Sequence, residues 1–308
     1  MIDDLDVRRA PVVWVIGESI MDVVTDAKGI TTRVPGGSPA NVAVGLSKLG
    51  VRTCLTTALG PDADGIVLES WLRDAGVVLA GTSVLPRTST SVAVLDLAGA
   101  ATYSFDLDWQ LPELAPVDRP DLVHVGSISA FLEPGATTLA GWIAALSPET
   151  VVTFDPNIRP AVLDDVTAAL AKFEAICSRA NIVKLSDEDA RWLYPLESPE
   201  AIASRIRHLG CESVIVTLGP AGALVSTASS VARLDAVPNH VVDTVGAGDS
   251  FMSGMLAALV RGHMSLQDSL EFAAHCASIT VSRRGADLPT ATDVVLRLDP
   301  APEWLLAL

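Results

Sequence analysis

Two glycines and an acid precede a run of small apolar residues at Gly246-Ala247-Gly248-Asp249, toward the C-terminal end of the sequence. Glycine lets the backbone turn tightly and come close to a ligand. A helix that begins here would point its free N–H groups, and the positive end of its dipole, at an anion. An aspartate beside such a site suits a general base that deprotonates an alcohol during phosphoryl transfer. Capping of the helix by Asp249 fits the same spacing, so this segment alone leaves both interpretations open.

A second group of small and polar residues, Gly36-Gly37-Ser38-Pro39-Ala40-Asn41, precedes a predicted helix near the N-terminus. Gly36 and Gly37 would let the backbone approach a sugar, and Asn41 offers both a hydrogen-bond donor and an acceptor. The carboxylate of Asp22 can accept hydrogen bonds from two sugar hydroxyls, and such a site rejects analogues that lack one of them. The alternatives are a solvent-facing helix position for Asn41 and a surface turn for Asp22.

Together the two motifs, about two hundred residues apart, resemble the paired signatures of the PfkB, or ribokinase-like, carbohydrate kinases. The likeness runs from about Val12 to about Pro289 and is greatest to bacterial fructokinases. It implies ATP-dependent phosphorylation of a primary sugar hydroxyl, with fructose favoured, 2-keto-3-deoxygluconate as runner-up, and ribose or a nucleoside as further alternatives. It also implies that Asp249 is the general base and that the backbone N–H groups of Gly246, Ala247 and Gly248 form the anion hole.

The resemblance extends to the sugar site and to a third segment, Asp155-Pro156-Asn157-Ile158-Arg159. It implies that the sugar is bound by five residues: Asp22, Gly36, Gly37, Asn41 and Asn157. The third segment resembles one in fructokinases and 2-keto-3-deoxygluconate kinases, where Asn and Arg face the substrates. The planar cation of Arg159 suits phosphate, which makes it a catalytic candidate, or the carboxylate of a sugar acid. A structural ion pair is the alternative for Arg159.

On the nucleotide side, Lys184-Leu185-Ser186-Asp187-Glu188-Asp189 occupies the place of the family's Asn-x-x-Glu motif. The resemblance implies that Ser186 and Asp189 organise Mg²⁺ through water, with Glu188 in this role if the register shifts by one. Capping of a helix by Ser186 is compatible with that role. The resemblance also implies two further sets of residues: a nucleotide-binding set of Lys184, Thr217, Gly219, Gly222 and Ser278, and a monovalent-cation (K⁺) site at Asp243 and Gly285. No Walker-type phosphate loop is present in the sequence.

Amino-acid composition excludes several classes of protein. The 308 residues carry a formal net charge of −16, which argues against a nucleic-acid surface and requires that ATP arrive with a metal ion. Four scattered cysteines form no Cys-x-x-Cys motif, as is typical of reduced thiols in a cytoplasmic protein. The uncharged segment 213–232 is interrupted by glycine and proline, so no membrane span is predicted there. The expected partners are a sugar and ATP, and the expected assembly is a homodimer formed through the lid described next.

Apolar runs alternate with helical patterns along the chain, which predicts an α/β fold: a ribokinase-like, doubly wound and mainly parallel sheet. Predicted strands cover residues 12–16, 53–59, 122–125, 151–154, 182–184 and 214–217, with an edge-like strand at 91–96. Predicted helices cover residues 40–49, 65–75, 137–146, 164–177, 187–194 and 199–209. Segments 20–35 and 88–108 alternate apolar and polar residues, as a small half-exposed sheet would, and the family implies that they form a lid over the sugar. The expectation is one kinase domain over residues 1–308 with these lid segments inserted.

Two functions from other classes fit parts of the sequence. A dinucleotide-dependent dehydrogenase shares the alternating βα order, but Gly17-Glu18-Ser19 ends the first strand without a following Gly-x-Gly-x-x-Gly. A non-catalytic sugar-binding regulator could keep the fold, and the replacements at Ser186 and Asp189 leave room for it. The intact Asp249 argues against a regulator.

Overall fold

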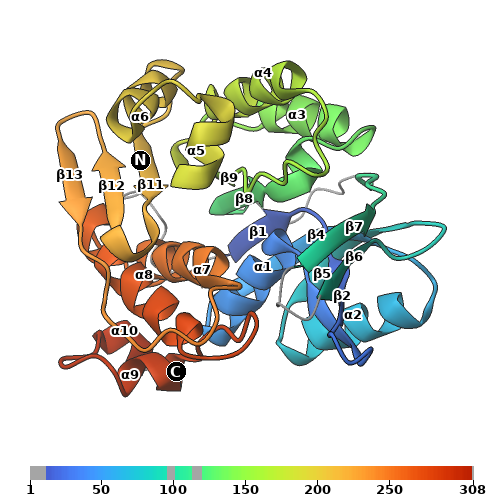
Figure 1. The fold of residues 1–308 in the computed structure, drawn as a ribbon. Coiled ribbons are helices and arrows are strands. Elements are labelled where there is room, and N and C mark those ends of the chain that lie inside the picture. Colours follow the sequence, from blue (N-terminus) through green and yellow to red (C-terminus); the bar gives the residue numbers. More distant parts are fainter. Residues whose placement is uncertain (1–11, 96–100, 113–119, 307–308) are drawn as a thin grey trace.

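The structure is a computed structural model that describes residues 12–95, 101–112 and 120–306. Its main feature is a sheet of nine strands, in the order β13-β12-β11-β10-β9-β8-β1-β4-β5 (Figure 1). The strands are β1 (Val12–Ile16), β4 (Arg52–Leu59), β5 (Val78–Val84), β8 (Leu122–Gly126), β9 (Val151–Asp155), β10 (Ile182–Ser186), β11 (Ser213–Thr217), β12 (Ala223–Ser226) and β13 (Val231–Leu234). All neighbours from β11 to β5 pair in parallel, and the β12–β13 hairpin adds an antiparallel edge.

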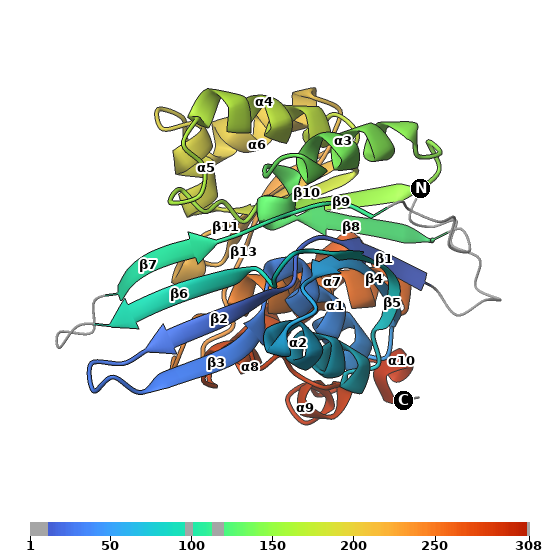
Figure 2. The same cartoon turned by 90° about the vertical axis from the view of Figure 1, so that its right-hand side faces the viewer.

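Helices cover both faces of this sheet (Figure 2). On one face lie α1 (Ser38–Lys48), α7 (Ala247–Val260) and α8 (Leu266–Val281), and on the other α3 (Gly135–Ala145), α4 (Val166–Cys177), α5 (Asp187–Leu193) and α6 (Pro199–His208). The short helices α9 (Ala291–Val295) and α10 (Glu303–Leu306) follow α8. Because successive strand residues point to opposite faces, β1 contributes to both cores: Val13 and Val15 pack with α1, α7 and α8, whereas Trp14 and Ile16 pack with α3–α6. Burial on both faces explains why the central strands are apolar runs without alternation.

A second sheet of four strands, in the order β3-β2-β6-β7, extends to one side of the body (Figure 2). Its strands are β2 (Ile20–Thr25), β3 (Thr31–Gly36), β6 (Thr90–Leu95) and β7 (Ala101–Asp106). Met21 and Val23 pack against Leu68 of α2 (Ala63–Asp74). Asp22 lies between them in the strand and points to the opposite face.

The predicted α/β fold with a small second sheet is confirmed. Each predicted central strand begins and ends within two residues of the expected positions. The expectation that the strand beginning at Ser91 lies at an edge was wrong. That strand, β6, pairs with both β2 and β7, so it is internal to the small sheet. The expected last residue of the strand, Asp96, lies outside the described residues. β5 and the β12–β13 hairpin were not predicted.

None of the helices in the described ranges is both long and apolar enough to cross a membrane. The four cysteines are buried and free.

Candidate active site

The first turn of α7 is shaped as the sequence predicts for an anion site. Gly246 precedes the helix with φ 76°, in the left-handed region. A Cβ at this position would lie 2.7 Å from the Cβ of Ala286, so both conformation and space favour glycine. The N–H of Ala247 donates to the carbonyl of Thr244 at 3.2 Å. The N–H groups of Gly248 and Asp249 have no partner within the helix, because the first amides of a helix never do.

Asp249 lies in this turn, and its side chain is held by residues of the N-terminal motif. Ser38 Oγ donates to Oδ1 at 2.6 Å, and Asn41 Nδ2 donates to Oδ2 at 2.8 Å. Asp249 is only 7% exposed. Two hydrogen bonds leave further lone pairs on the carboxylate for the proton of a substrate hydroxyl. The two sequence motifs therefore meet at one carboxylate.

The small sheet brings a second acid close to Asp249. Burial raises the pKa of Asp22, and the negative charge of Asp249 raises it further, against a hydrogen bond from Ser91 and the charge of Arg159. A Cβ on Gly36 would meet the carboxylate of Asp22, so a larger residue here would displace that side chain. Gly37 has φ 99°, and its added Cβ would lie 2.7 Å from the carbonyl oxygen of Glu18. Both glycines thus permit a close approach of backbone and side chains at this point.

Glu18, at the C-terminal end of β1, was not predicted as a site residue. It is 4% exposed and accepts a hydrogen bond from the N–H of Ser129 at 3.1 Å. Burial raises its pKa to about 7, although hydrogen bonds from Ser127 and Ser129 and the charge of Arg159 act to lower it. An acid directly after a buried strand of a parallel sheet was the signal that could have identified it.

Asn157 and Arg159 follow β9 and contact each other. Arg159 Nη1 donates to Asn157 Oδ1 at 2.7 Å and to the carbonyl of Ile158 at 3.1 Å. Among the described residues no carboxylate lies within ion-pair distance of Arg159, which disfavours a structural ion pair. The charge of Arg159 instead acts on Glu18 and Asp22. The structure therefore groups Arg159 with the acids on the side of the small sheet.

Lys184, in β10, forms a buried ion pair with Asp155 at the end of β9. Nζ and Oδ2 are 2.7 Å apart, and the two side chains are 5% and 2% exposed. Burial raises the pKa of Asp155 to about 6, despite the opposing charge of Lys184, and Asp189 and Asp249 raise it further. The pKa of Lys184 is also raised, because the effect of Asp155, Asp249 and Asp189 outweighs that of burial.

Ser186 and Asp189 form a capping box at the start of α5, as the alternative interpretation of this segment predicted. Ser186 Oγ accepts from the N–H of Asp189 at 3.0 Å, and Asp189 Oδ2 accepts from the N–H of Ser186 at 2.9 Å. Asp189 Oδ1 accepts from the N–H of Ile158 at 2.7 Å. Asp189 thereby ties the loop that carries Asn157 and Arg159 to α5.

The other residues expected on the nucleotide side lie at the end of β11, in the turn that follows it, and in α8. Gly219 and Gly222 bound the turn after β11, both with positive φ, and an added Cβ on Gly222 would collide with the carbonyl oxygen of Leu234. Thr217 Oγ1 donates to the carbonyl of Leu185 at 3.4 Å. The carbonyl of Ser278, in α8, accepts from Asn239 Nδ2 at 2.7 Å.

Asp243 and Gly285, the expected monovalent-cation residues, are in contact. The N–H of Gly285 donates to Asp243 Oδ2 at 2.8 Å, and the other oxygen accepts from the N–H of Val245 at 3.1 Å. No group of three or more His, Cys, Asp or Glu side chains within the described residues could hold a metal ion.

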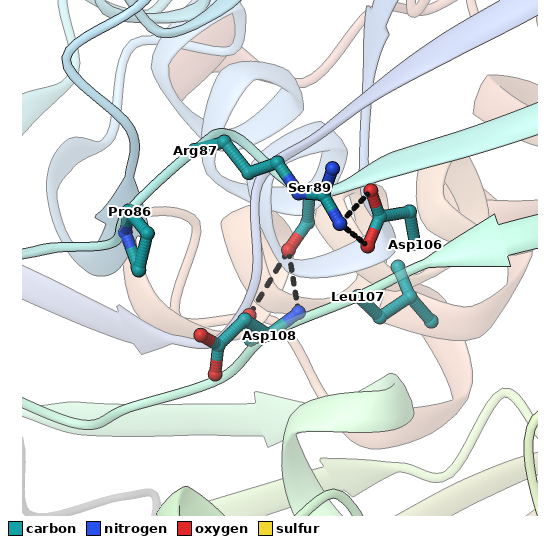
Figure 3. Close-up of a pocket in the computed structure, with 6 residues that line it drawn as sticks. All are labelled: Pro86, Arg87, Ser89, Asp106, Leu107 and Asp108. Atoms are coloured by element: carbon teal, nitrogen blue, oxygen red, sulfur yellow. Dashed lines mark hydrogen bonds and ion pairs between the residues drawn. The ribbon is translucent and has the colours of Figure 1, made fainter.

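A separate cavity of about 430 Å³ lies at the base of the small sheet, between the segment before β6 and the end of β7 (Figure 3). Its polar groups already bond to one another. Arg87 pairs with Asp106 at 2.7 Å, and Ser89 Oγ bonds to the carbonyl and the N–H of Asp108 at 3.0 and 2.9 Å. These contacts join the segment before β6 to the end of β7 and the residues that follow it. None of the lining residues was predicted to bind substrate.

Comparison with known proteins identifies the family of this chain. Residues 11–293 match the pfkB family of carbohydrate kinases, and the chain belongs to this family. It is 33% identical over 289 residues to the fructokinase of Salmonella typhimurium, with 89% of this chain and 94% of the relative covered. The fructokinase of Klebsiella pneumoniae is 31% identical over 292 residues, with the same coverage. The family predicted from the two motifs is confirmed.

Solved structures agree on the fold. A double mutant of the Vibrio cholerae O395 fructokinase, with fructose, ADP and a potassium ion bound, has a TM-score of 0.81 at 27% identity, covering 97% of this chain and 98% of that chain. Aminoimidazole riboside kinase from Salmonella enterica, complexed with aminoimidazole riboside and an ATP analog, has a TM-score of 0.78 at 25% identity, covering 96% and 99%.

Proposed function

We propose that this protein transfers the γ-phosphoryl group of ATP to a primary hydroxyl of fructose. The observation that carries the proposal is the buried carboxylate of Asp249, held by Ser38 and Asn41 at the start of α7. Fructose is favoured because relatives of at least 30% identity over most of the chain are named fructokinases.

In the proposed reaction, Asp249 accepts the proton of the sugar hydroxyl as its oxygen attacks the γ-phosphorus in line. The N–H groups at the start of α7 stabilise the charge that spreads onto the phosphoryl oxygens. Of the expected anion hole, the N–H groups of Gly246 and Gly248 have no acceptor among the described residues, whereas that of Ala247 donates to the carbonyl of Thr244. The N–H of Asp249 joins them as a donor. Transfer breaks the bond between the γ-phosphorus and its bridging oxygen and leaves ADP.

We place the sugar between the small sheet and α1, where Asp22, Gly36 and Gly37 come together. Asn41 Oδ1 is buried and has no hydrogen-bond partner among the described residues. A sugar hydroxyl that donates to this oxygen would satisfy it, since an unpaired buried acceptor costs free energy. Asn157, which accepts a hydrogen bond from Arg159, is assigned to the sugar as well.

The nucleotide is assigned to the side of the first turn of α7 that faces Lys184, together with the turn of Thr217, Gly219 and Gly222, and Ser278. Mg²⁺, when bound with ATP, neutralises phosphate charge during the transfer. Ser186 and Asp189 would act on its water shell, since each Asp189 oxygen keeps a free lone pair beside its one backbone hydrogen bond. Activity should therefore require Mg²⁺ or Mn²⁺ and disappear with a chelator.

A monovalent-cation site at Asp243 and Gly285 is supported by the hydrogen bond that joins these two loops. We expect K⁺ to raise the rate above that in Na⁺. Equal rates in matched K⁺ and Na⁺ buffers would remove this site and leave the kinase assignment intact.

A cytoplasmic location and a homodimer formed through the lid complete the proposal. Four free, buried thiols support a reducing compartment. Val34 and Val94 of the small sheet are 44% and 50% exposed, which supports contact with a second copy. Sedimentation equilibrium should give twice the chain mass, and Val34→Lys should lower it to one chain.

The assay that tests the function follows ADP release with fructose, 2-keto-3-deoxygluconate, ribose and adenosine as acceptors. Fructose is expected to give the highest kcat/KM. A higher value for 2-keto-3-deoxygluconate, ribose or adenosine would replace fructose as the substrate, whereas no turnover with any acceptor would contradict the kinase.

A further inference from the structure

We infer that Lys184 is a catalytic residue that stabilises the transferring phosphoryl group, and that Asp155 is the residue that positions it. The inference rests on the proposed kinase function and deepens it, because it names the side-chain cation at the anion site. The sequence predicted Arg159 for this task and Lys184 only for nucleotide binding.

The position of the ammonium is the first argument. A Cβ added to Gly248 would lie 3.0 Å from Lys184 Nζ. Gly248 carries one of the free N–H groups of the anion site, so the ammonium lies directly against the backbone on which a phosphoryl group would rest. Arg159, by contrast, bonds to Asn157 and acts on Glu18 and Asp22.

The local balance of charge is the second argument. Three buried carboxylates act on Lys184, namely Asp155, Asp189 and Asp249. A phosphoryl group that approaches Asp249 brings further negative charge into the same region. Backbone N–H groups supply only partial positive charge, so a full positive charge at Gly248 is needed for attack to occur beside an ionised base.

The incomplete bonding of the pair is the third argument. Asp155 is buried, and its Oδ1 has no hydrogen-bond partner among the described residues. Lys184 Nζ has three N–H groups. Within the residues that the structure describes, Asp155 Oδ2 is the one acceptor that they contact. A buried ion pair of this kind stabilises a fold no better than a well-packed apolar pair. Its presence is explained if Lys184 keeps donors for a phosphoryl oxygen that arrives with the substrate.

Substitution of both residues separates catalysis from folding. Lys184→Met leaves the Asp155 charge buried and unpaired and is expected to lower stability, so the informative protein is Asp155→Asn/Lys184→Met, which removes both charges. We expect this variant to unfold near the wild-type temperature, to keep its KM for fructose within about threefold, and to lose about 10²–10³ in kcat, the usual cost of removing one transition-state donor. If the double variant instead had a kcat within about tenfold of wild type, the inference would be overturned, because the pair would then serve folding alone.

Binding gives a readout that does not depend on turnover. ADP with aluminium fluoride mimics the transferring phosphoryl group, so wild type with fructose and Mg²⁺ should bind it more tightly than ADP. The double variant should bind ADP as wild type does and lose most of the additional affinity. Retention of that additional affinity would overturn the role of Lys184.

Lys172→Met is the matched control, because Lys172 also pairs with a carboxylate, Glu133 at 2.6 Å, but is partly exposed on α4. This variant should keep wild-type kcat and affinity for ADP with aluminium fluoride. Absence of sugar phosphorylation by wild type would refute the proposed function itself, whereas an active wild type with an equally active double variant would refute only this inference.

The role of Asp155 is tested by Asp155→Asn alone. The amide oxygen still accepts from Lys184, but the charge that fixes the ammonium is lost. We expect kcat to fall by about tenfold with KM for fructose unchanged. An unchanged kcat would remove the positioning role of Asp155.

Discussion

Asn41 and Asp249, 208 residues apart in the sequence, share a hydrogen bond of 2.8 Å that joins the first turns of α1 and α7. The amide nitrogen of Asn41 faces the carboxylate, and its amide oxygen is left for a substrate hydroxyl. One side chain can therefore orient the base and contact the sugar.

Asn41→Asp tests this orientation. The change places a second carboxylate beside Asp249, and two acids that share a site cannot both ionise easily, so the pKa of the base should rise. In a plot of kcat against pH, the rise on the acid side should move to higher pH by about one unit or more. Asn41→Ala is the control: it should lower kcat by about tenfold through lost orientation without moving this rise. An unshifted profile for Asn41→Asp would contradict the contact with Asp249.

Glu18 should make stability depend on pH. Burial raises its pKa from 4.5 to about 7, so the folded protein holds a proton that the unfolded chain has released between these values. The contribution of Glu18 to stability is complete below pH 4.5 and is lost as pH rises to about 7, a change of roughly 3 kcal/mol. Glu18→Gln should therefore be more stable than wild type at about pH 8 and should lose this advantage near pH 4.5.

Glu133→Gln provides a control of opposite sign for the same measurement. The hydrogen bond from Lys172 lowers the pKa of Glu133, so this acid stabilises the folded state at neutral pH and loses that effect as pH falls. Thermal unfolding of both variants from about pH 4 to 8 gives the comparison. If Glu18→Gln followed wild type at every pH, the buried carboxyl would not titrate as described.

Arg159→Lys distinguishes a sugar role from a phosphate role. Since Arg159 acts on Glu18 and Asp22, we expect the change to raise KM for fructose by about three- to tenfold and to leave kcat within about threefold. A fall in kcat with unchanged KM would instead support the phosphate contact that the sequence predicted for Arg159. Steady-state kinetics on fructose at saturating ATP provide both constants.

Gly222 and Gly219 should respond differently to alanine although they bound the same turn. Both have positive φ, but a Cβ meets the Leu234 carbonyl at Gly222 and open space at Gly219. Gly219→Ala should cost about 1 kcal/mol of unfolding free energy, and Gly222→Ala about 3 kcal/mol. Equal losses in urea unfolding would show that the backbone contact at Gly222 has no effect on stability.

Much of the fold could be predicted because the buried parallel strands are continuous apolar runs. β1 was predicted with its correct bounds, Val12–Ile16. β5 was missed because Gly81 interrupts a half-exposed edge strand, and β12 was missed because it is only four residues long and follows a Gly-rich turn. A single sequence gives no distance between separate segments, so the internal position of β6 could not be predicted either.

The same limit applies to the site. Asp249 and Asn41 were identified as functional from their motifs, but the contact between them requires the packing of α1 against α7. Ser38 lies within a recognised motif, but serine is common at the start of helices, so its type alone does not indicate a functional role. The placement of Lys184 against Gly248 depends on the register of β10 beside β9, which local patterns do not determine.

The most direct test of the account is the turnover number of Asp249→Asn with ATP and fructose. The introduced amide can accept a hydrogen bond from Asn41 and donate to the hydroxyl of Ser38, so the fold and the binding of fructose should be retained. Loss of the general base should lower kcat by about 10²–10⁴. A folded, fructose-binding Asp249→Asn protein that kept more than about a tenth of wild-type kcat would contradict the assignment of Asp249 as the base.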